Sequence, residues 1–451
     1  MPHASKNSGD TDSGRTVKSA EDAPLWLVRR GLVPESGPRR TLAVGSFINM
    51  IGNGLFMTGS ALFFTRSVGL SVSQVGAGMG AASLIGLGAG IPIGRLADVR
   101  GAKRTYLVTL VVQGIAMAAV TLVHSFWLFV AVICVSQLAS SASAASRGPL
   151  IRGFGGANPT QFRSYLRAAN NLAGACGALA AGVVVQLDTR NAYLALVLGN
   201  ALTFLACAAI IGRLPHLDPV QAPPMTSRWI ALKDKPYVVV TVLDGIMSIH
   251  GQVLLFALPL WIVGHSNSPR WLVGASAVIN TLIVVALQVR ASRKVDSNAA
   301  AARAVGRAAV AFLAGMALIA ASEGMPRALA TGLIIVGVVV HTIGELWHSA
   351  GSFELSFGLA PAHAQGQYSG LFGMGHGLMN AAAPTILAIF CIDWGARGWL
   401  AMGAIFIGVG LAMPYVSRWA ERTRTSEFQS HLVRLRQEGP EPTEQDRGDR
   451  L

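Results

Sequence analysis

The stretch Gly94-Arg-Leu-Ala-Asp-Val-Arg-Gly-Ala-Lys-Arg104 decides the fold, because it is a short basic turn between two apolar segments. Each segment is about twenty residues long, enough to cross the hydrocarbon core of a bilayer. Gly94 lacks a Cβ and lets two helix ends approach closely, and Gly101 allows a tight turn between them. Arginine and lysine cross a bilayer only at high cost. We therefore expect two membrane-spanning helices whose connecting turn faces the cytosol.

The composition is that of a membrane protein with many spans. Of 451 residues, 52% are hydrophobic and 13% are charged, and the mean hydropathy is +0.49. Soluble globular chains carry about 25% charged residues. The net charge of +14 does not indicate nucleic-acid binding, because the basic residues fall between apolar runs instead of forming one patch. The four cysteines lie inside apolar runs without metal-ligand spacing, and we expect neither a metal nor a cofactor.

Twelve apolar runs are long enough to span a membrane, which predicts an all-α membrane protein with twelve transmembrane helices in two pseudo-symmetric six-helix bundles. We expect the spans at residues 41–65, 74–94, 105–123, 126–147, 168–187, 193–213, 237–263, 271–290, 306–323, 328–358, 368–391 and 398–418.

Basic residues are concentrated in the loops on one side of these spans, which fixes the expected orientation. The loops of the other side contain only a few: Arg66, Arg190, Arg270, Arg327 and Arg397. Because loops rich in Lys and Arg stay in the cytosol, both termini are expected to be cytosolic in the cytoplasmic (inner or plasma) membrane. Residues 1–38 lack a signal-peptide pattern and are expected to form a disordered cytosolic tail, and 419–451 a polar cytosolic tail.

A long connection separates the first six spans from the last six. Residues 214–236 are expected to be a cytosolic linker between an N-terminal bundle, 39–213, and a C-terminal bundle, 237–418. The linker is rich in proline, at Pro215, Pro219, Pro223, Pro224 and Pro236. Two such bundles suit alternating access, in which the halves rock around a site near the bilayer midplane.

The turn at 94–104 resembles the loop between helices 2 and 3 of the major facilitator superfamily, whose pattern is roughly G-x-L-a-D-r-x-G-r-k. It matches at Gly94, Leu96, Ala97, Asp98, Gly101 and Lys103, whereas Val99 replaces the usual basic residue. The resemblance implies that Asp98 accepts hydrogen bonds from the N-terminus of the eleventh helix, near Gly366. The cytosolic gate expected on this basis comprises Gly94, Asp98, Arg100, Gly101, Lys103 and Arg104.

The fifth predicted span resembles the exporter signature of the same superfamily, gxxxGPxxGG. The segment Asn171-Leu-Ala-Gly-Ala-Cys-Gly-Ala-Leu-Ala-Ala-Gly182 keeps Gly177 and Gly182, with Ala178 in place of the proline and Ala181 in place of a glycine. This resemblance implies the bacterial drug and metabolite exporter branch, whose members are proton antiporters.

Two acidic residues within the spans are candidates for proton coupling. Asp244 lies about two turns into the seventh span and Glu345 near the middle of the tenth. We find no lysine or arginine at comparable depth, and we expect both carboxyls to be uncompensated and able to bind and release a proton. His341, Glu345 and His348 share one helical face, so the histidines join the proposed proton or cation site. The alternative is that these groups only hydrogen-bond neighbouring helices.

Neutral polar residues inside the spans form a second, weaker set of candidates. Such side chains orient a ligand when they face a central cavity, although each alone is more often a packing residue. The set comprises Asn49, Asn53, Gln137, Asn171, Asn280, His376 and Asn380.

The function expected from these features is proton-coupled efflux of small amphipathic or cationic molecules by alternating access, driven by the proton gradient. An uptake permease for a sugar or other small metabolite is the first alternative. A membrane enzyme or receptor without transport is the second, but the chain has no HExxH or GxSxG motif. The expected partners are a small-molecule substrate, protons and the lipid bilayer, without nucleic acid, and the protein is expected to be a monomer.

Overall fold

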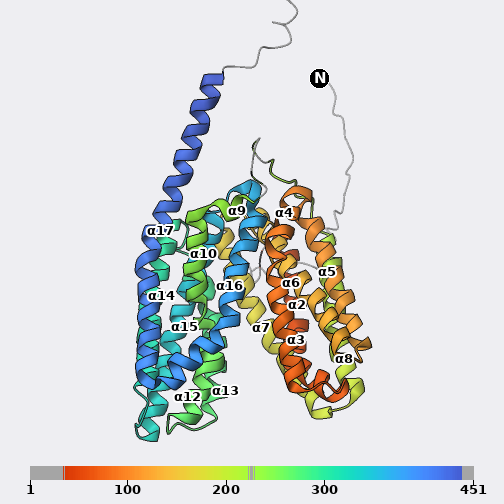
Figure 1. Cartoon of the computed structure of the whole chain (residues 1–451), viewed down its shortest axis with the longest axis vertical. Coiled ribbons are helices and arrows are strands. Elements are labelled where there is room, and N and C mark those ends of the chain that lie inside the picture. The colour runs from red at the N-terminus through yellow and green to blue at the C-terminus, as the bar shows by residue number, and fades with distance from the viewer. Residues whose placement is uncertain (1–33, 35, 222, 224–226, 228, 439–451) are drawn as a thin grey trace, which may run out of the picture.

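Long, roughly aligned helices make up the molecule in the computed structural model, which describes residues 34, 36–221, 223, 227 and 229–438 (Figure 1). Within these residues, eleven helices are long and apolar enough to cross a membrane. A twelfth span results if Ser73–Leu87 and Gly90–Arg100, which bend by 43° relative to each other, are counted as one. The same part of the chain contains no β-strand, only an isolated bridge between Ser266 and Glu323. The expected all-α membrane fold is confirmed.

Within the described residues, the first half of the chain supplies seven α-helices, which include the bent pair. They are α2 (Pro38–Leu62), α3 (Val72–Leu87), α4 (Gly90–Arg100), α5 (Ala102–Ala119), α6 (Phe126–Phe154), α7 (Pro159–Leu187) and α8 (Arg190–Gly212). The π-helical turn η1 (Phe63–Ser67) and the 3₁₀ turn η2 (Val120–Leu122) end the first and third spans.

The second half begins with a short helix and ends with the longest one. Its elements are α9 (Ile230–Lys233), α10 (Lys235–Ser248), α11 (His250–Gln252), η3 (Val253–Ala257), α12 (Leu258–Gly264), α13 (Leu272–Ser292), α14 (Asn298–Ala320), α15 (Arg327–Gly358), η4 (Ala362–Ala364), α16 (Gln365–Leu387), η5 (Ala388–Asp393) and α17 (Gly395–Glu438).

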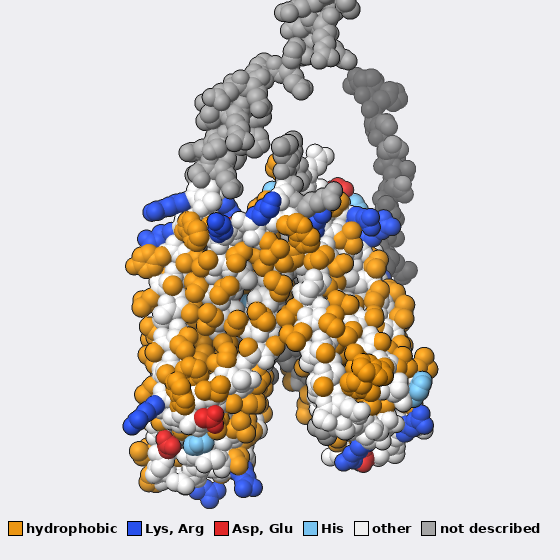
Figure 2. Space-filling model, in the orientation of Figure 1, with side chains coloured by type: hydrophobic (Ala, Val, Ile, Leu, Met, Phe, Trp, Pro, Cys, Tyr) orange, Lys and Arg blue, Asp and Glu red, His pale blue; other side chains and the backbone are white. Residues whose placement is uncertain are grey.

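Each half has its own apolar core. Phe64, Phe129 and Tyr193 are buried in the first, and Trp261 and Phe312 in the second. Figure 2 shows hydrophobic side chains over the sides of both halves, with basic side chains towards the two ends. In water this surface would be unstable, and a surrounding lipid phase accounts for it.

The two halves meet at one end and separate at the other. We call the end with α9 and the α4–α5 turn the linker side, and the end with α12 and the α7–α8 turn the far side (Figure 1). At the linker side α4 packs against α16, and on the far side the space-filling view shows an open gap between the halves (Figure 2). A Cβ placed on Gly94 would lie 2.1 Å from the Gly366 carbonyl oxygen, so only glycine permits this approach.

Several predicted boundaries were wrong. The fifth span begins at Pro159 instead of 168, because Asn158 caps its first turn and Pro159 suits the first helical position. The last helix continues past 418: the candidate span reaches Arg424, and α17 runs on to Glu438 through residues expected in a polar tail. Most of the predicted N-terminal tail, 1–33, lies outside the described residues.

Candidate functional site

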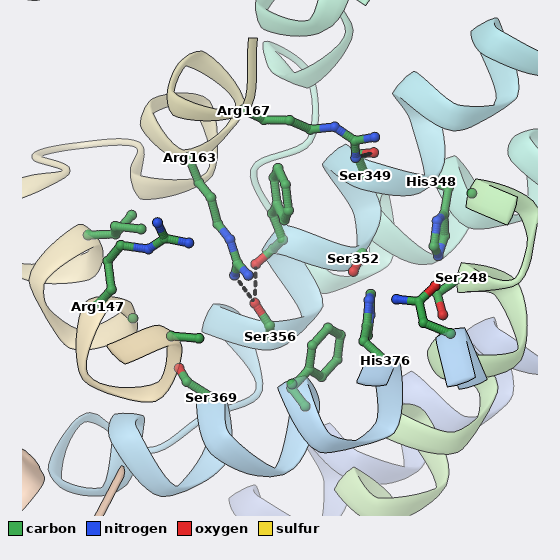
Figure 3. A pocket seen from close by; sticks show the side chains of 18 of the residues that line it. Arg147, Arg163, Arg167, Ser248, His348, Ser349, Ser352, Ser356, Ser369 and His376 are labelled. Atoms are coloured by element: carbon green, nitrogen blue, oxygen red, sulfur yellow. Dashed lines mark hydrogen bonds between the residues drawn. The ribbon is translucent and has the colours of Figure 1, made fainter. Parts of the chain in front are cut away.

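A polar cavity of about 350 Å³ lies between the two halves. Helices α6 and α7 line it from the first half, and α15 and α16 from the second. Figure 3 shows the arginines of α6 and α7 pointing across the cavity towards serine and histidine side chains of the opposite half. These arginines are Arg147, Arg163 and Arg167. The cavity therefore joins strongly basic and neutral polar surfaces.

Asp244 of α10 lies behind two histidines that line this cavity, fully buried and hydrogen-bonded on both oxygens. Its Oδ1 is 3.2 Å from His348 Nε2, and its Oδ2 accepts a bond of 2.9 Å from the Ser352 hydroxyl. His376 Nε2 lies 2.5 Å from Oδ2. His376 and His348 line the cavity, so imidazoles connect the carboxylate to it. A carboxylate paired with histidines can exchange a proton with them.

Two further histidines extend this cluster: His250, which also lines the cavity, and His341, which does not. His250 Nε2 is 3.0 Å from His348 Nδ1, and the His250 ring stacks on Phe312 with centroids 4.4 Å apart. His341 Nε2 lies 3.2 Å from the His250 carbonyl oxygen. His341 is therefore next to the cluster but fully buried, and it is not among the residues that line the cavity.

His250 was missed by the sequence analysis. It is six residues after Asp244, which puts it on a different face of a continuous helix. The seventh span is not continuous, because α10 ends at Ser248 and α11 begins at His250. The break turns the imidazole towards His348. A histidine inside an apolar run was the one available signal.

Glu345 was expected to lack a cationic partner, and this prediction was wrong. Arg167 Nη2 lies 2.5 Å from Glu345 Oε1, and Arg167 also donates to the Ser349 hydroxyl. Asn280 Nδ2 donates to Glu345 Oε2 at 2.7 Å. Because α7 starts at Pro159, Arg167 lies two turns inside the span and crosses to the other half. Asp244 has no lysine or arginine partner among the described residues, and its partners are the histidines described above.

Arg163 and Arg147 complete the basic wall of the cavity. Arg163 donates to the Ser356 hydroxyl at 2.7 Å, and its guanidinium lies 4.4 Å from the centre of the Phe353 ring. Arg147 interacts with the Tyr106 hydroxyl of its own half. Among the described residues, Arg167 is the only one of the three arginines that forms an ion pair.

Asp98 contacts the start of α16, as the resemblance implied. Its Oδ1 accepts the Gly366 amide hydrogen at 2.6 Å, and its Oδ2 accepts that of Gln367 at 3.0 Å. These are unpaired N–H groups at a helix N-terminus, where a carboxylate is favoured. Arg152 adds a second bridge between the halves by donating to the carbonyls of Phe357 (3.0 Å) and Ala360 (2.9 Å).

The other residues of the predicted gate stay within the first half. Gly101 has φ +95° and forms the turn between α4 and α5. Lys103 donates to the carbonyls of Gly212 (2.9 Å) and Leu214, which ties the turn to the end of α8. Arg100 and Arg104 are exposed. Of the predicted gate, Gly94 and Asp98 contact the opposite half directly.

The weaker candidates divide into two groups. Asn280, His376 and Asn380 belong to the site, since Asn280 bonds to Glu345 and the other two line the cavity. The remaining residues are bonded locally or are half-buried away from the cavity. Asn53 donates to Asn49 Oδ1 at 2.8 Å, Gln137 donates to Ser83 at 3.1 Å, and Asn171 is half-buried on α7.

Two helical halves surround a central polar cavity, and their apolar outer surface embeds them in a membrane. This arrangement defines a membrane transporter. The chain belongs to the Major Facilitator Superfamily, whose family model matches residues 42–384. The members of this family are transporters, so the chain is a transporter and not an enzyme.

Similar proteins agree with this assignment. The multidrug resistance protein MdtH of Klebsiella pneumoniae is 26% identical over 361 residues, which cover 77% of this chain and 86% of that protein. A bacterial homologue of the iron transporter ferroportin, solved in an outward-facing state, has a TM-score of 0.68 at 14% identity and covers 85% of this chain and 99% of that one. The human organic anion transporter MFSD10 has a TM-score of 0.64 at 14% identity, covering 84% and 99%. At such identities the two structures show the fold alone.

Proposed function

We propose that this protein is a proton-coupled secondary transporter of the cytoplasmic membrane that exports small amphipathic molecules. The similarity to multidrug resistance proteins supports export. Proton coupling is inferred from one observation: Asp244 is a fully buried carboxylate held by His348 and His376, which line the central cavity. The proton gradient is the driving force, and no cofactor is required.

The linker side is cytosolic in this proposal. The basic loops lie there, and positive charge stays on the cytosolic side of a membrane. The molecule then has its cytosolic side closed and its external side open, which corresponds to an outward-facing state (Figures 1 and 2). In this state the cavity exchanges protons and substrate with the outside.

Proton uptake near Asp244 changes the charge of a crowded site. His348 and Ser352 of α15, His376 of α16 and His250 of α11 surround it, and the charge of Arg163 on α7 acts on it from the opposite half. Each proton taken up makes this cluster more positive, which raises its attraction for any anion in it and its repulsion of Arg163. Access to water on one side at a time then sets when the proton enters and leaves.

The ion pair between Arg167 and Glu345 couples this charge change to movement. Arg167 belongs to α7 and Glu345 to α15, so the pair holds the two halves together at the closed side. Protonation of Glu345 removes its charge and weakens the contact to Arg167. The proton-loaded molecule therefore opens more easily towards the cytosol.

Proteoliposomes with a trapped pH indicator test this proposal. A pH jump is applied across the membrane, and movement of ethidium and of naphthalene-2-sulfonate is followed together with internal pH. Wild-type protein is expected to move at least one probe with a linked proton flux, and Asp244→Asn is expected to abolish the link. Asp218→Asn, whose side chain is 92% exposed in the linker, is the matched control. Equal linked flux in Asp244→Asn and wild type contradicts the proposal, and probe entry instead of exit favours an uptake permease.

A further inference from the structure

We propose that the central cavity selects organic anions, with a carboxylate or sulfonate group bound by Arg163 and Arg147 and an apolar body beside it. This inference rests on the proposed transport function and names its substrate class. It replaces the expectation of a cationic substrate, which depended on acidic residues without partners.

The permanently charged side chains that line the cavity are all positive. Three arginines line it, and no carboxylate does so among the described residues. The two nearby acids are already engaged: Asp244 lies behind His348 and His376, and Glu345 is bonded to Arg167 and Asn280. A cation entering the cavity would meet guanidinium groups first, whereas an anion would meet complementary charge.

Arg163 has the donors that such an anion needs. A guanidinium carries five N–H donors in a planar fork that matches a carboxylate or sulfonate. One donor bonds to the Ser356 hydroxyl, and the face of the group packs on Phe353. Positive charge held half-buried without an ionic partner is costly, and a bound anion removes that cost. Arg147, which also lacks an ion-pair partner among the described residues, lines the same cavity.

The rest of the lining suits the remainder of such a ligand. The Ser369 hydroxyl lines the cavity and can donate to an acceptor oxygen, whereas those of Ser248 and Ser352 already donate to the Gly245 carbonyl and to Asp244. Phe353 and Phe372 supply apolar surface for an aromatic or aliphatic body. A volume of about 350 Å³ lies near the lower end of the range for ligand sites, which favours small monoanions.

Calorimetric titration of the full-length protein in lipid nanodiscs tests this inference without requiring transport. The probes are naphthalene-2-sulfonate and an ammonium compound of the same ring system. We expect the sulfonate to bind about tenfold or more tightly than the ammonium. Arg163→Gln is expected to weaken sulfonate binding by about tenfold or more, and Arg163→Lys by less. Arg190→Gln, at the exposed start of α8, is expected to bind both probes as wild type does.

Three outcomes overturn the inference: equal or tighter binding of the ammonium, no binding of the sulfonate, or equal sulfonate affinity in Arg163→Gln and Arg190→Gln. If Arg163→Gln does not fold, Arg147→Gln takes its place, with the same expected loss. Sulfonate binding without proton-linked flux leaves anion selection standing and removes the proposed function. Proton-linked movement of ethidium without sulfonate binding leaves the proposed function standing and removes anion selection.

Discussion

Asp244 and Glu345 are both held by basic partners, but their partners come from different places. His348 and His376, which bond to Asp244, belong to the same half of the molecule as Asp244 does. Arg167, which bonds to Glu345, belongs to the other half. A change of charge on Asp244 can therefore occur while the halves stay together, whereas the pairing of Glu345 depends on their contact. We assign proton exchange with the cavity to Asp244, and to Glu345 a second protonation that weakens the contact between the halves.

A double-mutant cycle tests the pair at the residue scale. Arg167→Gln leaves Glu345 without its ionic partner and should lower thermal stability, and Glu345→Gln in addition should restore part of the loss. We expect a coupling free energy of about 1.5–3 kcal/mol, typical of a charged hydrogen bond in a partly buried site. The measurement is thermal unfolding of the four proteins in detergent. The exposed pair Arg66–Asp188, whose side chains are 56% and 44% exposed, is the matched control and should show much weaker coupling. Equal coupling in both pairs contradicts a special role for Arg167 and Glu345.

Asp188, at the far-side turn between α7 and α8, gives a prediction about pH. Hydrogen bonds from Tyr193 and then Arg66 hold the pKa of its carboxyl below the ordinary value. The folded-state pKa is lowered, so the carboxylate stabilises the fold above the unfolded pKa of about 4, and this contribution is lost as the pH falls below it. Asp188→Asn should reduce the melting temperature slightly at neutral pH and not at all in strong acid. Asparagine tolerates the positive φ of this residue, 44°, so the backbone is unaffected. An undiminished difference in acid would contradict the ionic origin of the effect.

At the scale of elements, the contact of α4 with α16 decides which side of the molecule is closed. Gly94 and Gly366 approach through backbone atoms, and Gly90 and Gly370 repeat the contact about one turn away. A methyl group at any of these positions forces the helices apart, since overpacking of this kind costs about 1–3 kcal/mol. The closed linker side therefore depends on glycine at all four positions.

Gly94→Ala is expected to open the linker side. Its Cβ would lie 2.1 Å from the Gly366 carbonyl oxygen, so the contact that places Asp98 on the Gly366 and Gln367 amides is lost. Hydrogen exchange of a peptide covering residues 362–372 should become faster by about fivefold or more, as the free-energy cost implies. Gly80→Ala in α3 is the matched control, because nothing lies within 4 Å of a Cβ there. Unchanged exchange in Gly94→Ala would mean that the halves do not close through this contact.

The elements themselves were largely predictable, and the polar partners in them were not. Each apolar run of about twenty residues marks a span, because a bilayer demands that length. The run that predicts the fifth span starts at 168, after the two arginines that the true helix includes, Arg163 and Arg167. A span that is located by hydropathy leaves out such charged residues. In the folded protein, however, they are paired or hydrogen-bonded with groups of the opposite half. The error in one helix boundary thus became the error about Glu345.

At the scale of the whole molecule, the sequence predicts which acids matter but not what they touch. Asp244, Glu345 and Asp98 stand out because a charged group in or next to a membrane span is energetically costly and is therefore a functional candidate. Their partners Arg167, His348 and His376 lie far from them along the chain, and only the packed fold brings them together. The periodicity of the sequence does not predict which residues form such pairs. For Asp98 and Gly366 the family resemblance predicts the pair instead.

The molecule as a whole is closed at the linker side and open at the far side (Figures 1 and 2). The bonds of Asp98, Arg152 and Arg167 to the second half all lie on the closed side of the central cavity or at its wall. Movement to the opposite state must break them together. Proton binding at Glu345 weakens one of them directly, which makes low pH the expected trigger for closure of the far side.

Spin-label distances across the far side measure this response most directly. Labels replace His124 of the first half and Trp271 of the second, both exposed, in a protein whose four native cysteines have been replaced. Lowering the pH from about 8 to about 5, across the range in which histidine titrates, should shift the wild-type distances to shorter values. Glu345→Gln should show the shorter distances already at high pH. Wild-type distances that do not depend on pH, or a Glu345→Gln protein that responds as wild type does, would contradict proton-controlled alternation of the two halves.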